Sequence, residues 1–196
     1  MLYIFGKIFV APIAFLLMRP RIKGLRNLFF RGKAIIVSNH WSLGDPIFLA
    51  IVSPRIIHFM AKQELFVSKT ARAFFKSLLT FPVNRKQADI ASLKHAKKLL
   101  DKGKVFGIFP EGRRSLTGEL DTMERGAAFI ALKCDAPIIP IYSDPNTLKK
   151  FRLHMVVGEP MDVKQIVETH KGKPVDVVTQ AISDRMHQLK LVMEAQ

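Results

Sequence analysis

Short apolar runs alternate with longer stretches of helical periodicity along most of this chain, and this alternation constrains its fold more than any other feature. The apolar runs, rich in β-branched and aromatic residues, are residues 34–37, 56–60, 81–83, 105–109, 138–142 and 153–157. Apolar residues recur at helical spacing in residues 68–79, 88–101, 125–133 and 175–193. Strands that alternate with helices predict an α/β fold with a mostly parallel central sheet flanked by helices.

The length of the chain limits the number of domains. Its 196 residues suit one domain and are few for two. No internal repeat, low-complexity stretch or linker divides the sequence. We therefore expect residues 1–23 to form an N-terminal membrane-associated segment and residues 24–196 to form a single domain.

The first eighteen residues are almost entirely apolar, with Lys7 as their only charge and Pro12 in the middle. A continuous helix of this length would reach about 27 Å, which is marginal for a hydrocarbon core about 30 Å thick. Four basic residues follow directly: Arg19, Arg21, Lys23 and Arg26. Such residues favour the cytoplasmic side of a membrane and attract anionic lipid. We expect a monotopic or peripheral helical segment on the cytoplasmic face of the cell membrane, and a buried core helix is the alternative.

The charge of the chain is strongly unbalanced, with 31 Lys and Arg against 16 Asp and Glu and a net charge of +15. A surface this basic collects polyanions, so anionic lipid, phosphorylated substrates and nucleic acid are all compatible with it. Because no recognised basic-aromatic module is present, we expect no specific nucleic-acid partner. A single cysteine excludes a disulfide framework and a cysteine-built zinc site, and no cluster of Asp, Glu and His suggests another metal.

His40 is followed five residues later by Asp45, across a turn that contains Gly44. This turn can bring the carboxylate onto the imidazole, where it would hold one ring N–H and stabilise the imidazolium as the other nitrogen takes a proton. No protein nucleophile stands beside the pair, so it suits direct activation of a substrate hydroxyl. The spacing also occurs by chance, in which case Ser38 or Asn39 would cap a helix and His40 would lie at the surface.

Two further clusters follow predicted strands, at the ends where α/β sheets usually bind ligands. Arg85 closes a short apolar run and offers a planar guanidinium to a phosphate. Farther along, Glu111, Gly112 and Arg113 bring together a carboxylate, a permissive turn residue and a guanidinium. A solvated loop arginine and a charged surface turn are the alternatives. Residues 136–140 are apolar and either line a groove for an acyl chain or enter the sheet.

In their order and combination these segments resemble the glycerolipid acyltransferases, the family that includes 1-acyl-glycerol-3-phosphate acyltransferase. Four motifs match in the order of the family: Asn39, His40 and Asp45 for Asn-His-x4-Asp, residues 81–85, residues 109–115 for Phe-Pro-Glu-Gly-x-Arg-Ser, and residues 137–140. The resemblance extends over about residues 24–158, which is most of the chain.

The resemblance implies a reaction and a set of roles. His40 would take the proton of an acceptor hydroxyl, Asp45 would orient His40, and the oxygen would attack an acyl thioester. The positions implied to bind the substrate are Arg85, Glu111, Gly112, Arg113, Ser115 and Arg125. The implied acceptor is the sn-2 hydroxyl of 1-acyl-glycerol 3-phosphate (lysophosphatidic acid), which becomes phosphatidic acid in phospholipid biosynthesis. The co-substrate is acyl-CoA or an acyl carrier protein thioester, with no metal or other cofactor.

Two positions depart from the pattern of the family. Arg113 stands where the family often has a small residue, and Glu124 stands where it commonly has a lysine. Arg125 follows, so either Arg125 takes over a phosphate contact or the acceptor differs. A different lysolipid or an amino-lipid is therefore the alternative acceptor, and a non-catalytic, basic membrane-binding protein is the alternative of another class.

Overall fold

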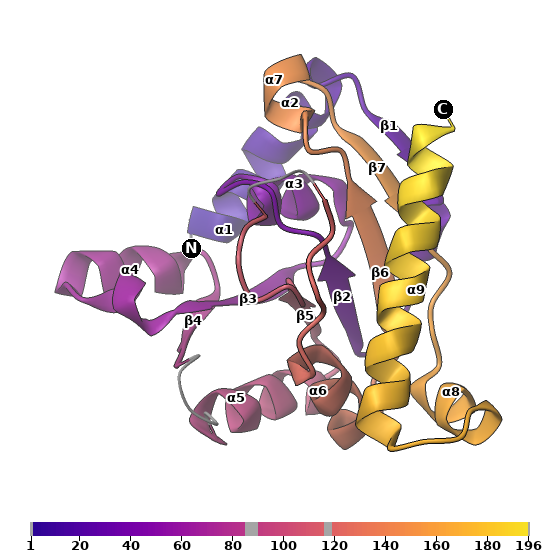
Figure 1. The fold of residues 1–196 in the computed structure, drawn as a ribbon. Coiled ribbons are helices and arrows are strands. Elements are labelled where there is room, and N and C mark those ends of the chain that lie inside the picture. Colours follow the sequence, from indigo (N-terminus) through magenta and orange to yellow (C-terminus); the bar gives the residue numbers. More distant parts are fainter. Residues whose placement is uncertain (1, 85–89, 116–118, 196) are drawn as a thin grey trace.

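A computed structural model of the chain describes residues 2–84, 90–115 and 119–195. In this part of the chain one sheet has the order β1-β7-β6-β2-β5-β3-β4 (Figure 1). Its strands are Arg21–Lys23 (β1), Ala34–Ser38 (β2), Ile57–Lys62 (β3), Thr80–Val83 (β4), Val105–Ile108 (β5), Ile138–Ser143 (β6) and His154–Val157 (β7). Only the pairing of β6 with β7 is antiparallel among the described strands. The predicted mostly parallel sheet is confirmed.

Helices cover both faces of the sheet. Along one face lie Ile90–Asp101 (α5), Gly126–Cys134 (α6) and Pro174–Glu194 (α9). The other face carries Asp45–Val52 (α3) and the N-terminal helical segment. Shorter elements connect these layers: Leu25–Leu28 (η2), Gln63–Phe66 (η3), Lys69–Ser77 (α4), Thr147–Lys150 (α7) and Val163–Thr169 (α8).

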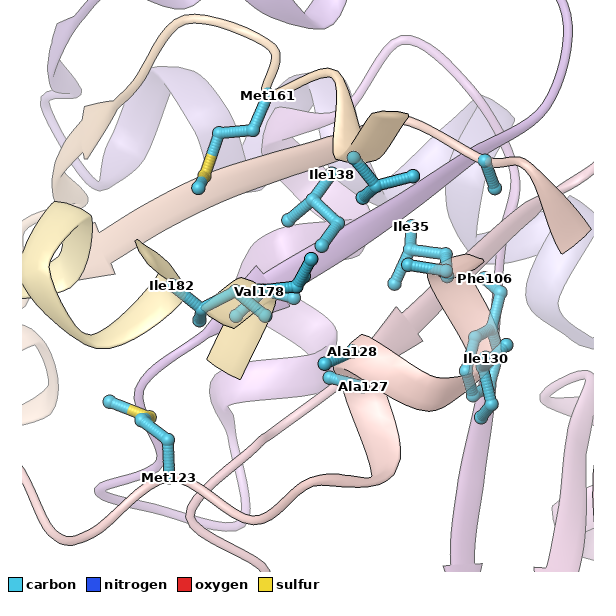
Figure 2. Close-up of a cluster of buried hydrophobic side chains, with 14 of the residues drawn as sticks. Ile35, Phe106, Met123, Ala127, Ala128, Ile130, Ile138, Met161, Val178 and Ile182 are labelled. Atoms are coloured by element: carbon cyan, nitrogen blue, oxygen red, sulfur yellow. The ribbon is translucent and has the colours of Figure 1, made fainter. Parts of the chain in front are cut away.

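The hydrophobic core has two layers, and the central strand β2 contributes to both. Ile35 and Val37 belong to the cluster beneath α5, α6 and α9, part of which Figure 2 shows, whereas Ile36 packs beneath α3. All residues of β2 are buried. A strand that is covered on both faces has an unbroken apolar sequence, which is why residues 34–37 predict it without alternation.

The N-terminal segment is a helical run of three pieces: Leu2–Phe5 (α1), the π-helix Gly6–Val10 (η1) and Ala11–Leu17 (α2). Pro12 has no backbone N–H, and the hydrogen-bond pattern changes from π to α directly before it, where the Ala11 N–H bonds to the Gly6 carbonyl. Among the residues that the structure describes, no helix combines the length and the apolar character needed to cross a membrane.

One face of this segment is docked on the domain. The buried Tyr3 accepts a hydrogen bond on its hydroxyl from the Ile57 N–H at 3.0 Å. Lys7 donates to the carbonyls of Ala50 and Ser53 at the end of α3. Away from these contacts the segment exposes large apolar side chains: Ile4, Ile8, Phe9, Ile13, Leu16 and Leu17. Leu2, Phe5 and Val10 are also exposed, beside the space between the segment and α3. The core-helix alternative therefore describes only the docked face, and membrane contact by the other face stays a prediction.

The sequence patterns do not predict α3 or β1. α3 is a helix of 8 residues that is almost wholly apolar, so it lacks the alternation of polar and apolar faces that marks a surface helix. Pro46 lies in its first turn, where the missing N–H breaks no helical hydrogen bond. β1 has only 3 residues and exists through its pairing with β7, which no local pattern encodes.

Candidate active site

The chain that leaves β2 is tied to the neighbouring strand β6. The Asn39 amide donates to the Ser143 carbonyl at 2.9 Å, and its oxygen accepts from the Ser143 N–H at 2.8 Å. The indole N–H of Trp41 donates to the same carbonyl at 2.9 Å. Because Asn39 and Trp41 flank His40, these bonds fix the loop that carries the histidine. The asparagine of the first motif thus has a structural role here.

Asp45 begins α3, and its carboxylate collects the loop that precedes it. Oδ2 accepts from His40 Nδ1 at 2.9 Å, from the Trp41 N–H at 2.6 Å and from the Ser42 N–H at 2.8 Å. Oδ1 accepts from the Ser42 hydroxyl at 2.9 Å. The predicted contact between the carboxylate and the imidazole is therefore confirmed. With Nδ1 donating to Asp45, Nε2 of His40 keeps its lone pair and has the form of a general base.

Aromatic rings support the other side of the imidazole. His40 stacks on Phe109 with ring centroids 4.2 Å apart, and Phe109 stacks on Phe59 at 6.0 Å. Gly107 lies on β5 beside this ring. A Cβ at that position would lie 2.4 Å from a ring carbon of Phe59, so only glycine leaves room for the ring. The stack holds the imidazole plane at the carboxyl end of the sheet, where the His40 side chain is 16% exposed.

The loop after β5 holds the backbone of His40 from both sides. Oε1 of Glu111 accepts from the His40 N–H at 3.0 Å, and Oε2 accepts from the Asp121 N–H at 3.2 Å. The Ser115 N–H donates to the His40 carbonyl at 2.9 Å, and its hydroxyl donates to the Glu119 carbonyl at 2.8 Å. Glu111 is 4% exposed, and burial raises the pKa of its carboxyl group. These contacts make Glu111 and Ser115 supports of His40, and substrate contact by either stays a prediction.

The remaining predicted binding residues lie at the rim of the site. Gly112 adopts a φ of +67°, which its turn requires. Arg113 forms an ion pair with Asp121 at 3.1 Å, and Arg125 forms one with Asp176 at 3.0 Å. Both guanidinium groups are largely exposed, so these pairs can open toward an anionic ligand at little cost. Arg85 lies outside the described residues.

Two adjoining cavities open beside this rim, on the face of the sheet that carries α5 and α6. One has a volume of about 590 Å³ and is lined by Phe109, Glu111, Arg113 and neighbouring residues. The second, about 600 Å³, extends from Arg125 toward the start of α9. Four residues line both cavities: Met60, Val83, Ile108 and Gly126.

A third cavity lies on the opposite face of the sheet. It has a volume of about 320 Å³, and apolar residues of the N-terminal helices and of α3 line it, together with Phe59. Phe59 thus belongs both to the lining of this space and to the stack that supports His40. The fourth motif is elsewhere: residues 138–140 are buried in the central strand β6. Of the two interpretations of that segment, entry into the sheet is the one observed.

The described residues contain no group of three or more His, Cys, Asp or Glu side chains arranged to hold a metal ion. The sequence did not predict the contributions of Ser42, Phe59 and Asp121: Ser42 bonds to Asp45 through its N–H and hydroxyl, Phe59 stacks on Phe109, and the Asp121 N–H bonds to Glu111. Only Ser42 carried a local signal, because a serine three residues before an aspartate can bond to its carboxylate.

Comparisons with known proteins identify the family of this chain. A sequence model of the acyltransferase family matches residues 19–144. The 1-acyl-sn-glycerol-3-phosphate acyltransferase of Bacillus subtilis is 33% identical over 162 residues, which cover 80% of this chain and 80% of that protein. The protein of the same name from Streptococcus pneumoniae is 30% identical over 139 residues, 67% of this chain and 51% of that protein.

The fold is also found in a solved structure. The crystal structure of the 1-acyl-sn-glycerophosphate acyltransferase from Thermotoga maritima superimposes with a TM-score of 0.71 at 19% identity. The match covers 98% of this chain and 79% of that one. On the family match and these relatives, the chain belongs to the acyltransferase family.

Proposed function

We propose that this protein transfers an acyl group from a thioester to the sn-2 hydroxyl of 1-acyl-glycerol 3-phosphate, which yields phosphatidic acid. The observation that carries the proposal is the His40–Asp45 pair, held at 2.9 Å. Phe109 and Glu111, which contact His40, line the cavity that bears Arg113, and the cavity that bears Arg125 adjoins it. The names of the relatives support the choice of acceptor. Both acyl-CoA and an acyl carrier protein thioester fit as donors.

In the proposed reaction His40 Nε2 takes the proton of the acceptor hydroxyl, and the freed oxygen pair attacks the thioester carbonyl carbon. Asp45 stabilises the imidazolium that results, because its carboxylate accepts the hydrogen bond from Nδ1–H. When the tetrahedral intermediate collapses, the C–S bond breaks, and the thiolate leaves with the electron pair of that bond. The imidazolium returns its proton to the sulfur, so His40 ends the cycle neutral.

We assign the phosphate of the acceptor to the arginine rim. Arg113 and Arg125 lie on the walls of the adjoining cavities, and each is paired with an aspartate that a phosphate would replace. The resemblance adds Arg85 to this set. The cavity between the N-terminal segment and α3 suits an acyl chain, since most of its lining side chains are apolar, with Lys7 and Thr80 as polar exceptions, and since it includes Phe59 of the stack.

We also propose that the protein lies on the cytoplasmic face of the membrane. The exposed apolar face of residues 2–17 supports this, because a monomeric soluble protein rarely exposes so many large apolar side chains together. Docking of the other face by Tyr3 and Lys7 favours a helix in the plane of the interface over one that crosses the bilayer.

A substrate panel tests the reaction. Purified protein in neutral detergent is supplied with acyl-CoA or acyl carrier protein thioester and with lysophosphatidic acid, lysophosphatidylcholine or 1-acylglycerol. We expect thiol release and phosphatidic acid with lysophosphatidic acid alone, since the other acceptors lack a phosphate monoester for the arginines. Faster turnover of another acceptor would contradict the assignment, and silence with the whole panel in a folded protein would favour the non-catalytic alternative.

A further inference from the structure

A small basic pocket lies where the N-terminal helix ends, away from the arginine rim of the active site. Two loops form it, one after α2 and one after α7, and Figure 1 shows these elements beside each other. Backbone hydrogen bonds join the loops: the Leu153 N–H bonds to the Met18 carbonyl at 2.9 Å, and the Arg21 N–H bonds to the Leu153 carbonyl at 2.7 Å. These bonds hold the two loops together, so the pocket is part of the folded domain.

Its cavity has a volume of about 480 Å³, and its lining has an unusual composition. Leu17, Arg19, Lys150, Phe151 and Arg152 line it, so three of the five residues are cationic and none is acidic. Lys150 is paired with the Asp144 carboxylate at 3.3 Å. The guanidinium groups of Arg19 and Arg152 form no ion pair or hydrogen bond with any residue that the structure describes.

The backbone at this pocket is held in a conformation that residues with a side chain rarely adopt. Arg19 has a φ of +43° and Phe151 a φ of +44°, both in the left-handed region. Such strain persists where the surrounding structure imposes it and is concentrated at functional sites. Here it accompanies an exposed phenyl ring, 60% accessible, between two cationic side chains.

The position of the pocket relative to the apolar face indicates what it binds. Ile13, Leu16 and Leu17 are 61%, 73% and 62% exposed, and Leu17 itself lines the pocket. Apolar side chains followed by cations match the layers of a bilayer: the apolar side chains would contact the acyl region, and the cations would contact the phosphates. A nucleic acid or an acidic protein would use the cations and leave the apolar side chains in water. An anionic phospholipid uses both.

The pocket also lies near the carboxyl ends of the parallel strands, the edge of the sheet that carries the active site. β7 is antiparallel to β6, so its first residue, His154, lies beside the end of β6, where the Asp144 N–H bonds to the His154 carbonyl at 3.0 Å. His40 follows β2, whose carboxyl end lies at this same edge because β2 and β6 are parallel. A headgroup bound at the pocket would therefore turn the carboxyl edge, and His40 with it, toward the bilayer.

We propose that Arg19, Lys150 and Arg152 bind the phosphate of an anionic phospholipid in the bilayer, with Leu17 and Phe151 against its acyl region. This inference rests on the membrane association in the proposed function. It adds a lipid site that is distinct from the substrate site, which is bounded by Arg113 and Arg125. The site holds the enzyme in one orientation on the membrane surface and takes no part in proton transfer.

Vesicle flotation of matched double variants tests the proposal. The unaltered protein, R19Q/R152Q and K133Q/K171Q are mixed with vesicles of phosphatidylcholine and phosphatidylglycerol at 4:1, and with phosphatidylcholine alone, in 0.1 M KCl. Both double variants lower the net charge of +15 by two. All four side chains are exposed, and none has a bonding partner in the described part of the chain. Both variants should therefore unfold at the temperature of the unaltered protein.

We expect R19Q/R152Q to partition about 30-fold more weakly onto the anionic vesicles, the combined effect of two cations near a charged surface. K133Q/K171Q should change partition less than about twofold, because its lysines lie at the far end of β6 and beside the start of α9. Equal losses in both variants would mean a diffuse charge effect and would overturn the proposal. So would an unchanged R19Q/R152Q. Release of the unaltered protein by inorganic phosphate at constant ionic strength would also overturn it, because free phosphate would then be the ligand.

One further arm separates this proposal from the proposed function. Acyl transfer by the unaltered protein is measured in neutral detergent, where no anionic bilayer is present. An active protein that does not bind the anionic vesicles would overturn the lipid site and leave acyl transfer standing. An inactive protein whose vesicle binding depends on Arg19 and Arg152 would support the lipid site and contradict acyl transfer.

Discussion

Replacing Glu111 by Gln tests whether this buried carboxylate supports His40 or contacts substrate. In the structure its two oxygens accept one N–H each, from His40 and from Asp121. The amide of Gln has one oxygen, so one of these N–H groups loses its acceptor and faces an NH₂ group. A buried donor without a partner costs about 1–3 kcal/mol, and relief of the carboxylate desolvation offsets part of this. We expect a net loss of about 1–2 kcal/mol at pH 7.

This loss corresponds to a fall of about 2–8 °C in Tm, at about 2–4 °C per kcal/mol for a chain of this size. Displacement of the His40 backbone should lower kcat about tenfold, less than the roughly 10²-fold cost of a misplacement of about 1 Å, because only one of the supporting bonds is lost. The KM for the acceptor should change less than about twofold, since no substrate contact is removed. Glu124→Gln is the matched control: Glu124 lines the same cavity, is exposed and has no side-chain partner among the described residues.

Steady-state assays of thiol release and calorimetric unfolding measure both effects. The difference in stability between the unaltered protein and the Glu111→Gln variant should also narrow as the pH rises. Burial raises the pKa of Glu111 above its usual 4.5, so its contribution to stability is full below that value and is lost as the pH rises through the raised pKa. A tenfold rise in the KM of the acceptor with an unchanged kcat would refute this reasoning and make Glu111 a substrate contact.

Three further changes test other parts of the structure. In Asp45→Asn the amide oxygen can keep the three N–H bonds, and the amide nitrogen can donate to the Ser42 hydroxyl. We therefore expect a protein that is folded by circular dichroism and whose kcat is lowered about 10²–10⁴-fold. Ala50→Trp should fill part of the apolar cavity, and loss of room for two methylene groups would lower kcat/KM for long relative to short acyl chains about 15-fold in competition assays. Burial lowers the pKa of His58, so the unfolded chain binds its proton more readily, and stability should be full above about pH 6.5 and fall below it. Urea unfolding at pH 7.5 and 5.0 should show a smaller loss for His58→Leu, and an equal loss would contradict this cause.

The strands of the central sheet could be predicted because a strand that is buried on both faces is apolar at successive positions in the sequence. β2, β5 and β6 are covered on both faces, and each appears in the sequence as a short apolar run. α3 could not be predicted, because its 8 mostly apolar residues give no helical period and its place is set by packing under the N-terminal segment. The antiparallel direction of β7 also depends on pairing with a distant strand and has no local signal.

The candidate site divides in the same way. The contact between His40 and Asp45 spans five residues, so spacing and a turn residue were enough to predict it. The bonds from Glu111 and Ser115 to the His40 backbone join positions more than 70 residues apart in the chain. The sequence predicted that these residues matter, through the motif of the family, but the interpretation as substrate contacts did not foresee their backbone partners. The role of Arg85 stays a prediction from the resemblance.

The central claim is that His40 Nε2 acts as the general base, and His40→Ala tests it most directly. Acyl transfer to lysophosphatidic acid is measured as thiol release, with His187→Ala as the control because His187 is exposed on α9 and bonds only to the Ser183 carbonyl among described residues. We expect His40→Ala to lower kcat about 10²–10⁴-fold, the usual contribution of general-base catalysis, and to unfold like the unaltered protein, while the control keeps its full activity. A folded His40→Ala protein that keeps a third or more of the activity would show that His40 is not the general base.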